Sequence, residues 1–202
     1  MNKMTPMETL KAATASWHDA LEAHAQSRKI MDLSLSRTAF ERLLSFQYSL
    51  HQALEPQMTP YLDAHFPQLA YGETRQKLAA LAKDMQVLKV AQAPPQVSDE
   101  DADYIHTPAE ALGAAYVLEG ATLGGQVILR HLKQIPEIAQ DEPFHYYGLY
   151  GDQVGPRWKT FQSVANASLT EEDDRAAAVD AAVKTFKLAC QIYETMDQAL
   201  VS

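Results

Sequence analysis

The segment ALGAAYVLEGATLGGQVILRHL, residues 111–132, is the stretch of sequence that most clearly indicates the fold class. Its apolar residues recur at helical spacing after the start signal TPAE at 107–110, which combines a capping threonine, an early proline and a capping-box glutamate. Gly120, Gly124 and Gly125 interrupt this helix, and each interior glycine costs about 1 kcal/mol relative to alanine. Glycines one turn apart allow a flat or bulky group to touch the backbone. Close packing of two helices across small residues is the alternative, and the sequence leaves both open.

Further helix starts lie on either side of this segment. The stretch TPME at residues 5–8 repeats the same start signal, and SLTE at 168–171 is another. No Asn-Gly or Asp-Gly hairpin signal joins alternating apolar runs. Helices are expected at about residues 5–25, 36–55, 57–65, 73–91, 107–134 and 170–200, with a short one at 156–166 and an irregular stretch at 135–156. Breaks are expected at Pro56, Pro67 and Pro94-Pro95. The sequence therefore predicts an all-α fold, as a single domain over residues 1–202.

Composition excludes several classes of partner. The 202 residues carry a formal net charge of -9, which argues against binding to nucleic acid or to an anionic membrane surface. No run approaches the roughly 20 consecutive apolar residues that a membrane span needs. Residues 1–24 indicate an amphipathic helix rather than a signal peptide. Because the single cysteine, Cys190, cannot form an internal disulfide, we expect a reducing compartment and a cytoplasmic location.

A histidine in the first expected helix is the clearest candidate metal ligand. Thr14 and His18 lie at i, i+4 on the flank of an apolar stripe, so we expect His18 to project into the edge of the core. Neutral imidazole is the usual proximal donor to haem iron, and Glu22 could accept the other ring N–H. A hydrogen-bonded core histidine is the alternative, because the same His-x-Ala-Leu-Glu pattern recurs at residues 51–55.

The two segments, taken together, resemble the haem oxygenase family. LKAATASWHDALE at residues 10–22 resembles its proximal helix, and AYVLEGATLGGQ at 115–126 resembles the distal helix of bacterial members, including those linked to bacteriophytochromes. Residues 150–161 and 184–186 fit the C-terminal half of the family, and the similarity runs from about residue 8 to residue 195.

The resemblance implies a helical fold that holds haem b between a proximal and a distal helix. It assigns His18 as the axial iron ligand and Glu22 as the nearby acidic residue. It places Gly120, Gly124 and Gly125 where the distal backbone approaches the macrocycle. Lys11, Tyr116 and Lys159 match the groups that hold the haem propionates, with Arg157 a weaker candidate, and Phe186 matches an aromatic residue of the pocket wall.

The chain departs from the animal enzymes of this family at two positions. Ala121 stands where they carry an aspartate that orders water beside bound oxygen, so backbone groups or polar side chains such as Thr122 would have to do this. Ser163 stands where they carry a propionate-binding arginine. The first departure bears on turnover, and the second bears on haem orientation and therefore on which meso carbon is attacked.

The activity that the resemblance implies is oxidation of haem by O2 to biliverdin, carbon monoxide and ferrous iron. A neutral imidazole, unlike a thiolate, does not strongly favour O–O cleavage, which suits attack on the porphyrin itself. Because the sequence has no flavin or nucleotide motif, electrons are expected from a ferredoxin-like or other small reductase. A bacteriophytochrome is a candidate recipient of the biliverdin.

Three other functions remain as alternatives. A haem-binding or haem-storage protein would keep the pocket and lose turnover because of Ala121. A carboxylate-bridged di-iron protein would need two Glu-x-x-His pairs, and the sequence has one, Glu142–His145. A non-haem enzyme acting on a thiamin-like or quinone-precursor molecule would need a nucleophile, and Cys190 lies in a helix whose pattern indicates packing.

Overall fold

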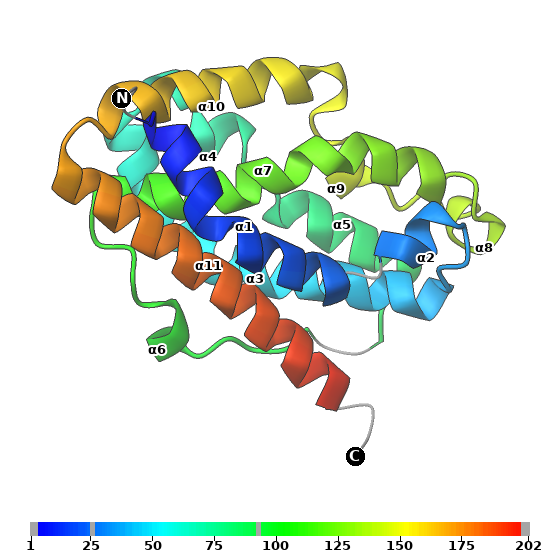
Figure 1. Ribbon diagram of the computed structural model, residues 1–202. Helices are drawn as coiled ribbons and strands as arrows, with labels where there is room; N and C mark the ends of the chain where they lie inside the picture. The colour runs from blue at the N-terminus through cyan, green and yellow to red at the C-terminus, as the bar shows by residue number, and fades with distance from the viewer. Residues whose placement is uncertain (1–3, 25–26, 92–93, 199–202) are drawn as a thin grey trace.

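The computed structural model describes residues 4–24, 27–91 and 94–198, and its regular elements in these ranges are all helices (Figure 1). The α-helices are α1 Pro6–His24, α2 Ser27–Met31, α3 Arg37–His65, α4 Tyr71–Thr74, α5 Leu78–Leu88, α6 Asp99–Ala102, α7 Pro108–Leu132, α8 Pro136–Ala139, α9 His145–Gly148, α10 Val154–Ser168 and α11 Glu172–Gln198. Two 3₁₀ turns, η1 Pro67–Leu69 and η2 Gly151–Gln153, complete the set. The all-α prediction is confirmed.

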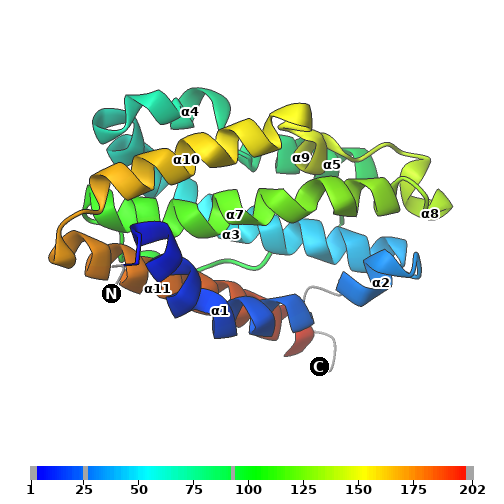
Figure 2. The ribbon, with the colours of Figure 1, turned by 45° about the horizontal axis from the view of Figure 1, so that its top comes forward.

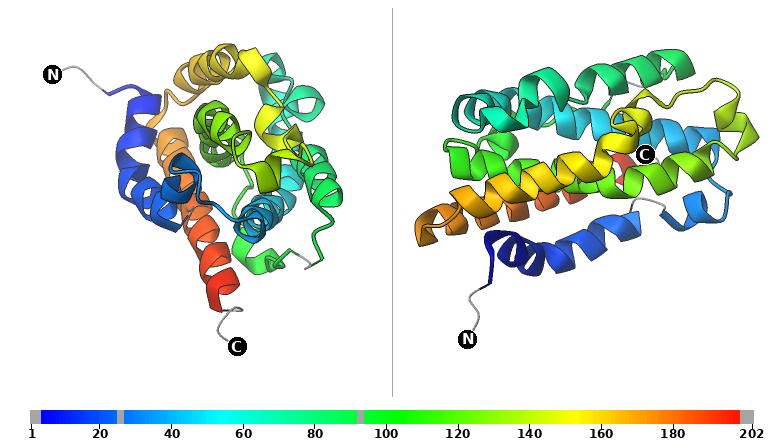
Figure 3. Two further views of the ribbon diagram at one scale, coloured as in Figure 1. Left: turned by 90° about the vertical axis from the view of Figure 1, so that its right-hand side faces the viewer. Right: turned by 90° about the horizontal axis from the view of Figure 1, so that it is seen from above.

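The helix that carries the glycines, α7, is the centre of the bundle. Seen end-on, it is surrounded by α1, α3, α10 and α11 (Figure 3). α11 packs on α7 and α3, while α1 lies mainly on α11 and touches α10. Fully buried side chains such as Phe40, Leu44, Leu112 and Phe161 join these helices into one core. The first half of α7 is therefore held on all sides.

The start signals behave as the sequence predicts. The Thr107 hydroxyl accepts from the Glu110 amide at 3.2 Å, and the Glu110 carboxylate accepts from the His106 amide at 2.8 Å. At the start of α1, the Glu8 amide donates to the Thr5 hydroxyl at 3.3 Å and the Thr5 amide donates to the Glu8 carboxylate at 2.8 Å. Both are capping boxes, which satisfy amides that have no partner within the helix.

The expected break at Pro56 is wrong, because α3 runs without interruption from Arg37 to His65. Pro56 and Pro60 both lie on the exposed side of the helix, where water can hydrate the carbonyls that they leave unpaired. On the opposite side Leu54, Met58 and Leu62 are fully buried. Burial of such side chains contributes about 1.5–3 kcal/mol each and offsets the cost of the prolines.

The helix expected at 73–91 is two helices, α4 and α5, with a buried turn between them. Arg75 and Lys77 in this turn are almost inaccessible to solvent. The carboxylate of Glu55 on α3 caps α5, because it accepts from the amides of Lys77 at 2.7 Å and Leu78 at 3.3 Å. The stretch expected to be irregular at 135–156 also contains short elements, namely α8, α9 and η2.

Among the described residues one helix, α7, is long and apolar enough to span a membrane by length and composition alone. In its most apolar window 44% of the residues are buried inside the bundle. The core helix of a soluble protein meets the same criterion, so this is weak evidence for a membrane span.

Candidate functional site

Two helices of the predicted site, α1 and α7, are joined near their amino-terminal halves. Thr14 on α1 is buried, donates to the Leu10 carbonyl at 2.8 Å and lies beside the Tyr116 hydroxyl of α7. Burial raises the pKa of Tyr116, and the neighbouring Thr14 hydroxyl partly opposes this. The start of α1 is also fixed to α10, because the Met7 amide donates to Asn166 Oδ1 at 3.1 Å.

Beyond this junction His18 stands on an open surface. α1 and α7 run in the same direction (Figure 2), so His18 lies one turn past Thr14, as Gly120 lies one turn past Tyr116. The His18 side chain is 63% exposed. Its ring contacts Phe186 of α11 edge-on, with centroids 6.3 Å apart. The expectation that His18 projects into the edge of the core is therefore wrong, because α1 packs mainly on α11 and α10 and leaves the His18 side chain exposed.

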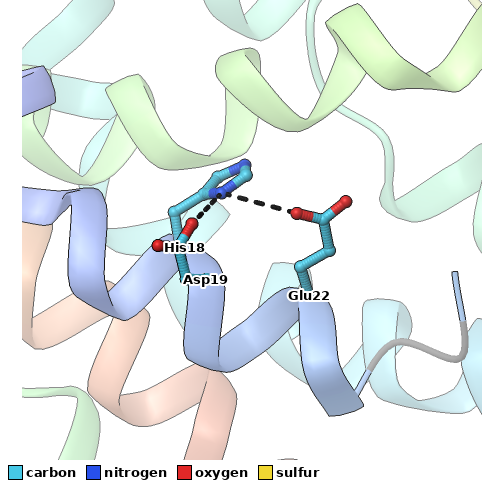
Figure 4. A group of neighbouring side chains, drawn as sticks. All are labelled: His18, Asp19 and Glu22. Carbon is cyan, nitrogen blue, oxygen red and sulfur yellow. Dashed lines mark ion pairs between the residues drawn. The ribbon is translucent and has the colours of Figure 1, made fainter.

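The two nitrogens of the His18 ring have different surroundings. Nδ1 lies 3.7 Å from Asp19 Oδ1 and 3.9 Å from Glu22 Oε2, too far for hydrogen bonds but close enough for electrostatic attraction. Figure 4 shows the ring standing up from α1 with its other nitrogen, Nε2, away from both carboxylates. Glu22 is thus beside Nδ1 as predicted, without accepting a hydrogen bond from it. Asp19 is a second acidic neighbour, which was not predicted from the sequence.

The side of α7 that carries Gly120, Leu123, Gly124 and Val127, called here the bare face, is open and apolar. These positions follow i, i+3, i+4 and i+7 and share one face of the helix. A Cβ atom added to Gly124 would meet nothing within 4 Å, and one added to Gly120 would meet only Trp158, at 3.8 Å. Leu123 and Val127 are 44% and 45% exposed, which is unusual for large apolar side chains.

The other glycines of α7 have different neighbours. Gly125 is buried, and a Cβ there would lie 3.8 Å from the Tyr147 ring. At Gly113 an added Cβ would lie 2.1 Å from the Ala178 carbonyl oxygen of α11. The packing explanation therefore applies to Gly113, whereas Gly120 and Gly124 leave backbone open to a ligand.

The cationic candidates for binding propionates divide into two groups. Lys11 and Lys159 are exposed, and neither forms an ion pair within the described part of the chain. Arg157 instead donates to the carbonyl and hydroxyl of Thr74, at 2.7 and 2.9 Å, and stacks on the Tyr150 ring. Arg157, the weaker candidate for binding a propionate, is thus already hydrogen-bonded to α4.

These surroundings fit a haem. The described residues offer an accessible imidazole with a free ring nitrogen on α1, a bare apolar surface on α7, and lysines without ion pairs on α1 and α10. A flat macrocycle needs apolar contact on both faces, an axial donor on one side and cations near its carboxylates. Tyr116 and Trp158, with ring centroids 6.0 Å apart, add aromatic surface beside Gly120.

Few polar side chains near Ala121 could replace, on the bare face, the aspartate that the animal enzymes carry at this position. Ala121 is exposed. Thr122, expected to take over from it, donates to the Glu119 carbonyl at 2.6 Å. Ser163, the second departure, is exposed on α10.

A buried charge cluster made of Arg75, Lys77 and Glu119 was not predicted from the sequence. Lys77 Nζ lies 2.7 Å from Glu119 Oε1, and Arg75 pairs with the other carboxylate oxygen. The Tyr150 hydroxyl also donates to Glu119, at 2.7 Å. Burial raises the pKa of Glu119, but Lys77 and Arg75 outweigh it, so the pKa lies below the ordinary value. The one signal in the sequence was Glu119, a charged residue within an apolar helix. Its partners could not be predicted, because Lys77 and Arg75 lie 42 and 44 positions away.

The residues that a di-iron protein or a non-haem enzyme would use have structural roles in this fold. His145 Nδ1 pairs with the buried Asp84 at 2.7 Å, and Glu142 is exposed in the preceding loop. Cys190 is buried, and burial raises the pKa of its thiol, which disfavours the reactive thiolate.

Comparison with known proteins gives consistent results. A family model described as heme oxygenase matches residues 5–195. A heme oxygenase of Xanthomonas campestris is 35% identical over 116 residues, which span 55% of this chain and 64% of that relative. The matched region thus covers slightly less than two thirds of the relative.

Solved structures share the fold. The heme oxygenase of Leptospira interrogans superposes with a TM-score of 0.78 at 17% identity, covering 94% of this chain and 98% of that one. The NO- and CO-bound heme oxygenase of Neisseria meningitidis has a TM-score of 0.72 at 20% identity, covering 96% and 92%. Heme oxygenase-1 of Synechocystis, solved in complex with heme, has a TM-score of 0.72 at 15% identity, covering 98% and 95%.

Proposed function

Because the chain belongs to the haem oxygenase family, we propose that it binds haem b between α1 and the bare face of α7 and converts it to biliverdin, carbon monoxide and ferrous iron. The observations that carry this proposal are the exposed imidazole of His18 on α1 and the open backbone of Gly120 and Gly124 on α7. The bound haem would supply the iron that activates dioxygen and would itself be the substrate.

In this proposal His18 binds the iron through Nε2. Asp19 and Glu22 lie on the Nδ1 side, where their negative charge favours a proton on that nitrogen and leaves the lone pair on Nε2. Phe186 supports the ring edge-on and limits its rotation. These three residues thus orient a neutral imidazole towards α7.

The residues around the opening would fix the orientation of the macrocycle. Gly120 and Gly124 allow the backbone of α7 to approach the face opposite His18, and Leu123 and Val127 exclude water from it. Lys11 and Lys159 are proposed to pair with the propionates, together with the hydroxyl of Tyr116. Gly125 and Ala121 lie beside this face, where Gly125 leaves room for the Tyr147 ring and Ala121 presents only a methyl group.

We place the reaction in the cytoplasm, with electrons from a separate ferredoxin-like or other small reductase. The absence of a nucleotide-binding motif in the sequence supports an external donor. A bacteriophytochrome that takes up biliverdin is the proposed recipient, on the resemblance of residues 115–126 to bacterial members that serve such receptors.

A second candidate is a haem-binding protein with little or no turnover. The observation that favours it is the methyl group of Ala121, which cannot order water beside the bare face. The two candidates predict the same binding and differ in the fate of the haem.

The test is to load the protein with one equivalent of hemin and then add reductant and air. Turnover predicts loss of the haem absorption bands, appearance of biliverdin and release of iron to a ferrous chelator. Persistence of the haem bands under the same conditions would select the binding protein. Failure to take up hemin would reject both candidates.

A further inference from the structure

α10 lies alongside α7 (Figure 2), and its half-buried residue Trp158 closes one end of the bare face. A Cβ atom added at Gly120 would lie 3.8 Å from the indole carbon Cη2, whereas one added at Gly124 would meet nothing within 4 Å. Tyr116, one turn before Gly120, also faces Trp158, with ring centroids 6.0 Å apart and ring planes tilted by 41°. The indole therefore covers α7 near Gly120 and leaves the backbone at Gly124 uncovered.

Trp158 is held in place by the packing of its own helix. Its indole stacks on Phe161, with ring centroids 5.6 Å apart and planes inclined by 12°, and Phe161 is fully buried. The preceding residue, Arg157, donates to the Thr74 carbonyl at 2.7 Å, and Asn166 further along α10 accepts from an amide in the first turn of α1 at 3.1 Å. Moving the indole would give up its stacking on Phe161. Trp158 is therefore a fixed wall at the end of the bare face.

The length of the open surface makes this wall important for a bound macrocycle. From Gly120 to Val127 the helix advances by about 10 Å at 1.5 Å per residue, which is comparable with the width of a porphyrin ring. Lys159, next to Trp158, is exposed and forms no ion pair within the described ranges. Its flexible side chain can attract a carboxylate but cannot fix the angle of the macrocycle. A rigid ring that the macrocycle touches can fix that angle by steric contact.

We propose that Trp158 is a specificity-determining residue that limits in-plane rotation of the macrocycle and so selects the meso carbon that is attacked. This rests on the proposed function. The edge of the macrocycle would contact the indole while Lys11 and Lys159 hold the propionates, so charge would bring the ring to α10 and shape would set its angle. Removing the indole would uncover Tyr116 and extend the bare face past Gly120. The macrocycle could then take further in-plane orientations, and attack would be distributed over more than one meso carbon.

The first test determines the in-plane orientation by proton NMR of the ferric cyanide complex, whose haem methyl resonances report it without turnover. We expect one dominant orientation in the parent protein. Trp158→Ala should lower the ratio of major to minor orientations about two- to tenfold, the range for loss of one aromatic contact. Trp158→Phe can still stack on Phe161 and should keep the ratio of the parent. Trp158→Leu shortens the wall and should act like Trp158→Ala, which preserves the test if the alanine variant does not fold.

Two control variants separate the wall from charge and from the general loss of a ring. Lys159→Ala should change the ratio more at low salt than at high salt, because exposed charges are screened, whereas the effect of Trp158→Ala should not depend on salt. Tyr61→Ala removes a half-buried ring of α3 and should leave the ratio unchanged. The parent ratio in both Trp158→Ala and Trp158→Leu would overturn the proposal while leaving haem binding intact. If the parent binds no hemin, the proposed function fails and this inference fails with it.

The second test is a crystal structure of the hemin complex. We expect an atom of the macrocycle within about 4 Å of the Trp158 indole, the distance of van der Waals contact. A macrocycle bound in the site but separated from the indole by water would overturn the proposal, whatever the product of turnover.

Discussion

Two residues of similar sequence context, His18 and His51, have opposite environments. Both are followed by Ala-Leu-Glu one turn on, yet His18 is exposed while His51 is buried and bonded to Glu55 at 2.8 Å. The difference comes from the helices that face them. α3 has neighbours on several sides, whereas α1 packs mainly on α11 and leaves His18 exposed. Local sequence cannot distinguish these cases, because tertiary packing decides which histidine is accessible.

Lys11 and Lys159 provide a test at the scale of single residues. Both are exposed and unpaired among described residues, so replacing both with alanine should not affect folding. Exposed ion pairs contribute about 0.2–1 kcal/mol each, so loss of two should lower hemin affinity roughly two- to thirtyfold at low salt, and less at high salt. The biliverdin isomer mixture should also change, because the propionates would no longer fix one orientation.

The control for this experiment is the double variant Lys29→Ala/Lys83→Ala, which removes the same charge from other exposed positions. Affinity and product analysis by chromatography should match the parent protein. An isomer mixture in Lys11→Ala/Lys159→Ala identical to that of the parent would remove both lysines from the site.

At the scale of elements, α7 combines a packed first half with an open second half. Gly113 allows α11 to approach the backbone of α7, whereas Gly120 and Gly124 leave the bare face open. In the sequence, a glycine that allows close helix packing cannot be distinguished from one that leaves the backbone open to a ligand. The helix and its start could be predicted from the sequence, but the partner of each glycine depends on how α1, α10 and α11 are placed.

Alanine substitutions at Gly113 and Gly124 distinguish the packing glycine from the glycine of the bare face. Gly113→Ala places a methyl group against the Ala178 carbonyl and should lower the free energy of unfolding by about 1–3 kcal/mol. Gly124→Ala meets no atom and should raise it by about 0.5–1 kcal/mol through helix propensity, while weakening hemin binding. Urea unfolding and hemin titration measure the two effects. Unchanged haem affinity in Gly124→Ala would show that the bare face does not contact the ligand.

The sequence predicts most elements of the fold and fails where long-range contacts decide the outcome. The capping boxes at Thr5 and Thr107 depend on neighbours within one turn and are confirmed. The continuous α3 depends on the core that Leu54 and Leu62 enter, which local proline rules do not include. The charge cluster joins residues more than 40 positions apart, so no spacing pattern reveals it.

At the scale of the whole molecule, buried titratable groups couple stability to pH. Burial lowers the pKa of His51 below its ordinary value despite the attraction of Glu55, so the unfolded chain binds a proton there that the folded chain resists. Glu119 has a pKa below its ordinary value in the folded state, because its cationic partners outweigh the effect of burial. In both cases the unfolded state binds more protons, so stability falls as the pH decreases.

We therefore expect the Tm to fall as the pH decreases, first below about pH 6.5 through His51 and then more steeply below about pH 4.5 through Glu119. His51→Gln, which cannot titrate and can still donate to Glu55, should flatten the curve between pH 7 and 5. The control His65→Gln removes an exposed histidine of the same helix and should leave the curve unchanged. Calorimetry from pH 4 to pH 8 measures both, and an unaltered slope in His51→Gln would contradict this account.

His18 is proposed to ligate haem iron across from the bare face of α7, and hemin titration of His18→Ala is the decisive experiment. The control is His106→Ala, which removes another exposed histidine, located just before α7. We predict that the parent and His106→Ala bind one hemin with the spectrum of a histidine-ligated complex. His18→Ala should lose that spectrum while its circular dichroism stays the same, and imidazole added to it should restore the spectrum. A histidine-ligated spectrum in His18→Ala without added imidazole would contradict the account.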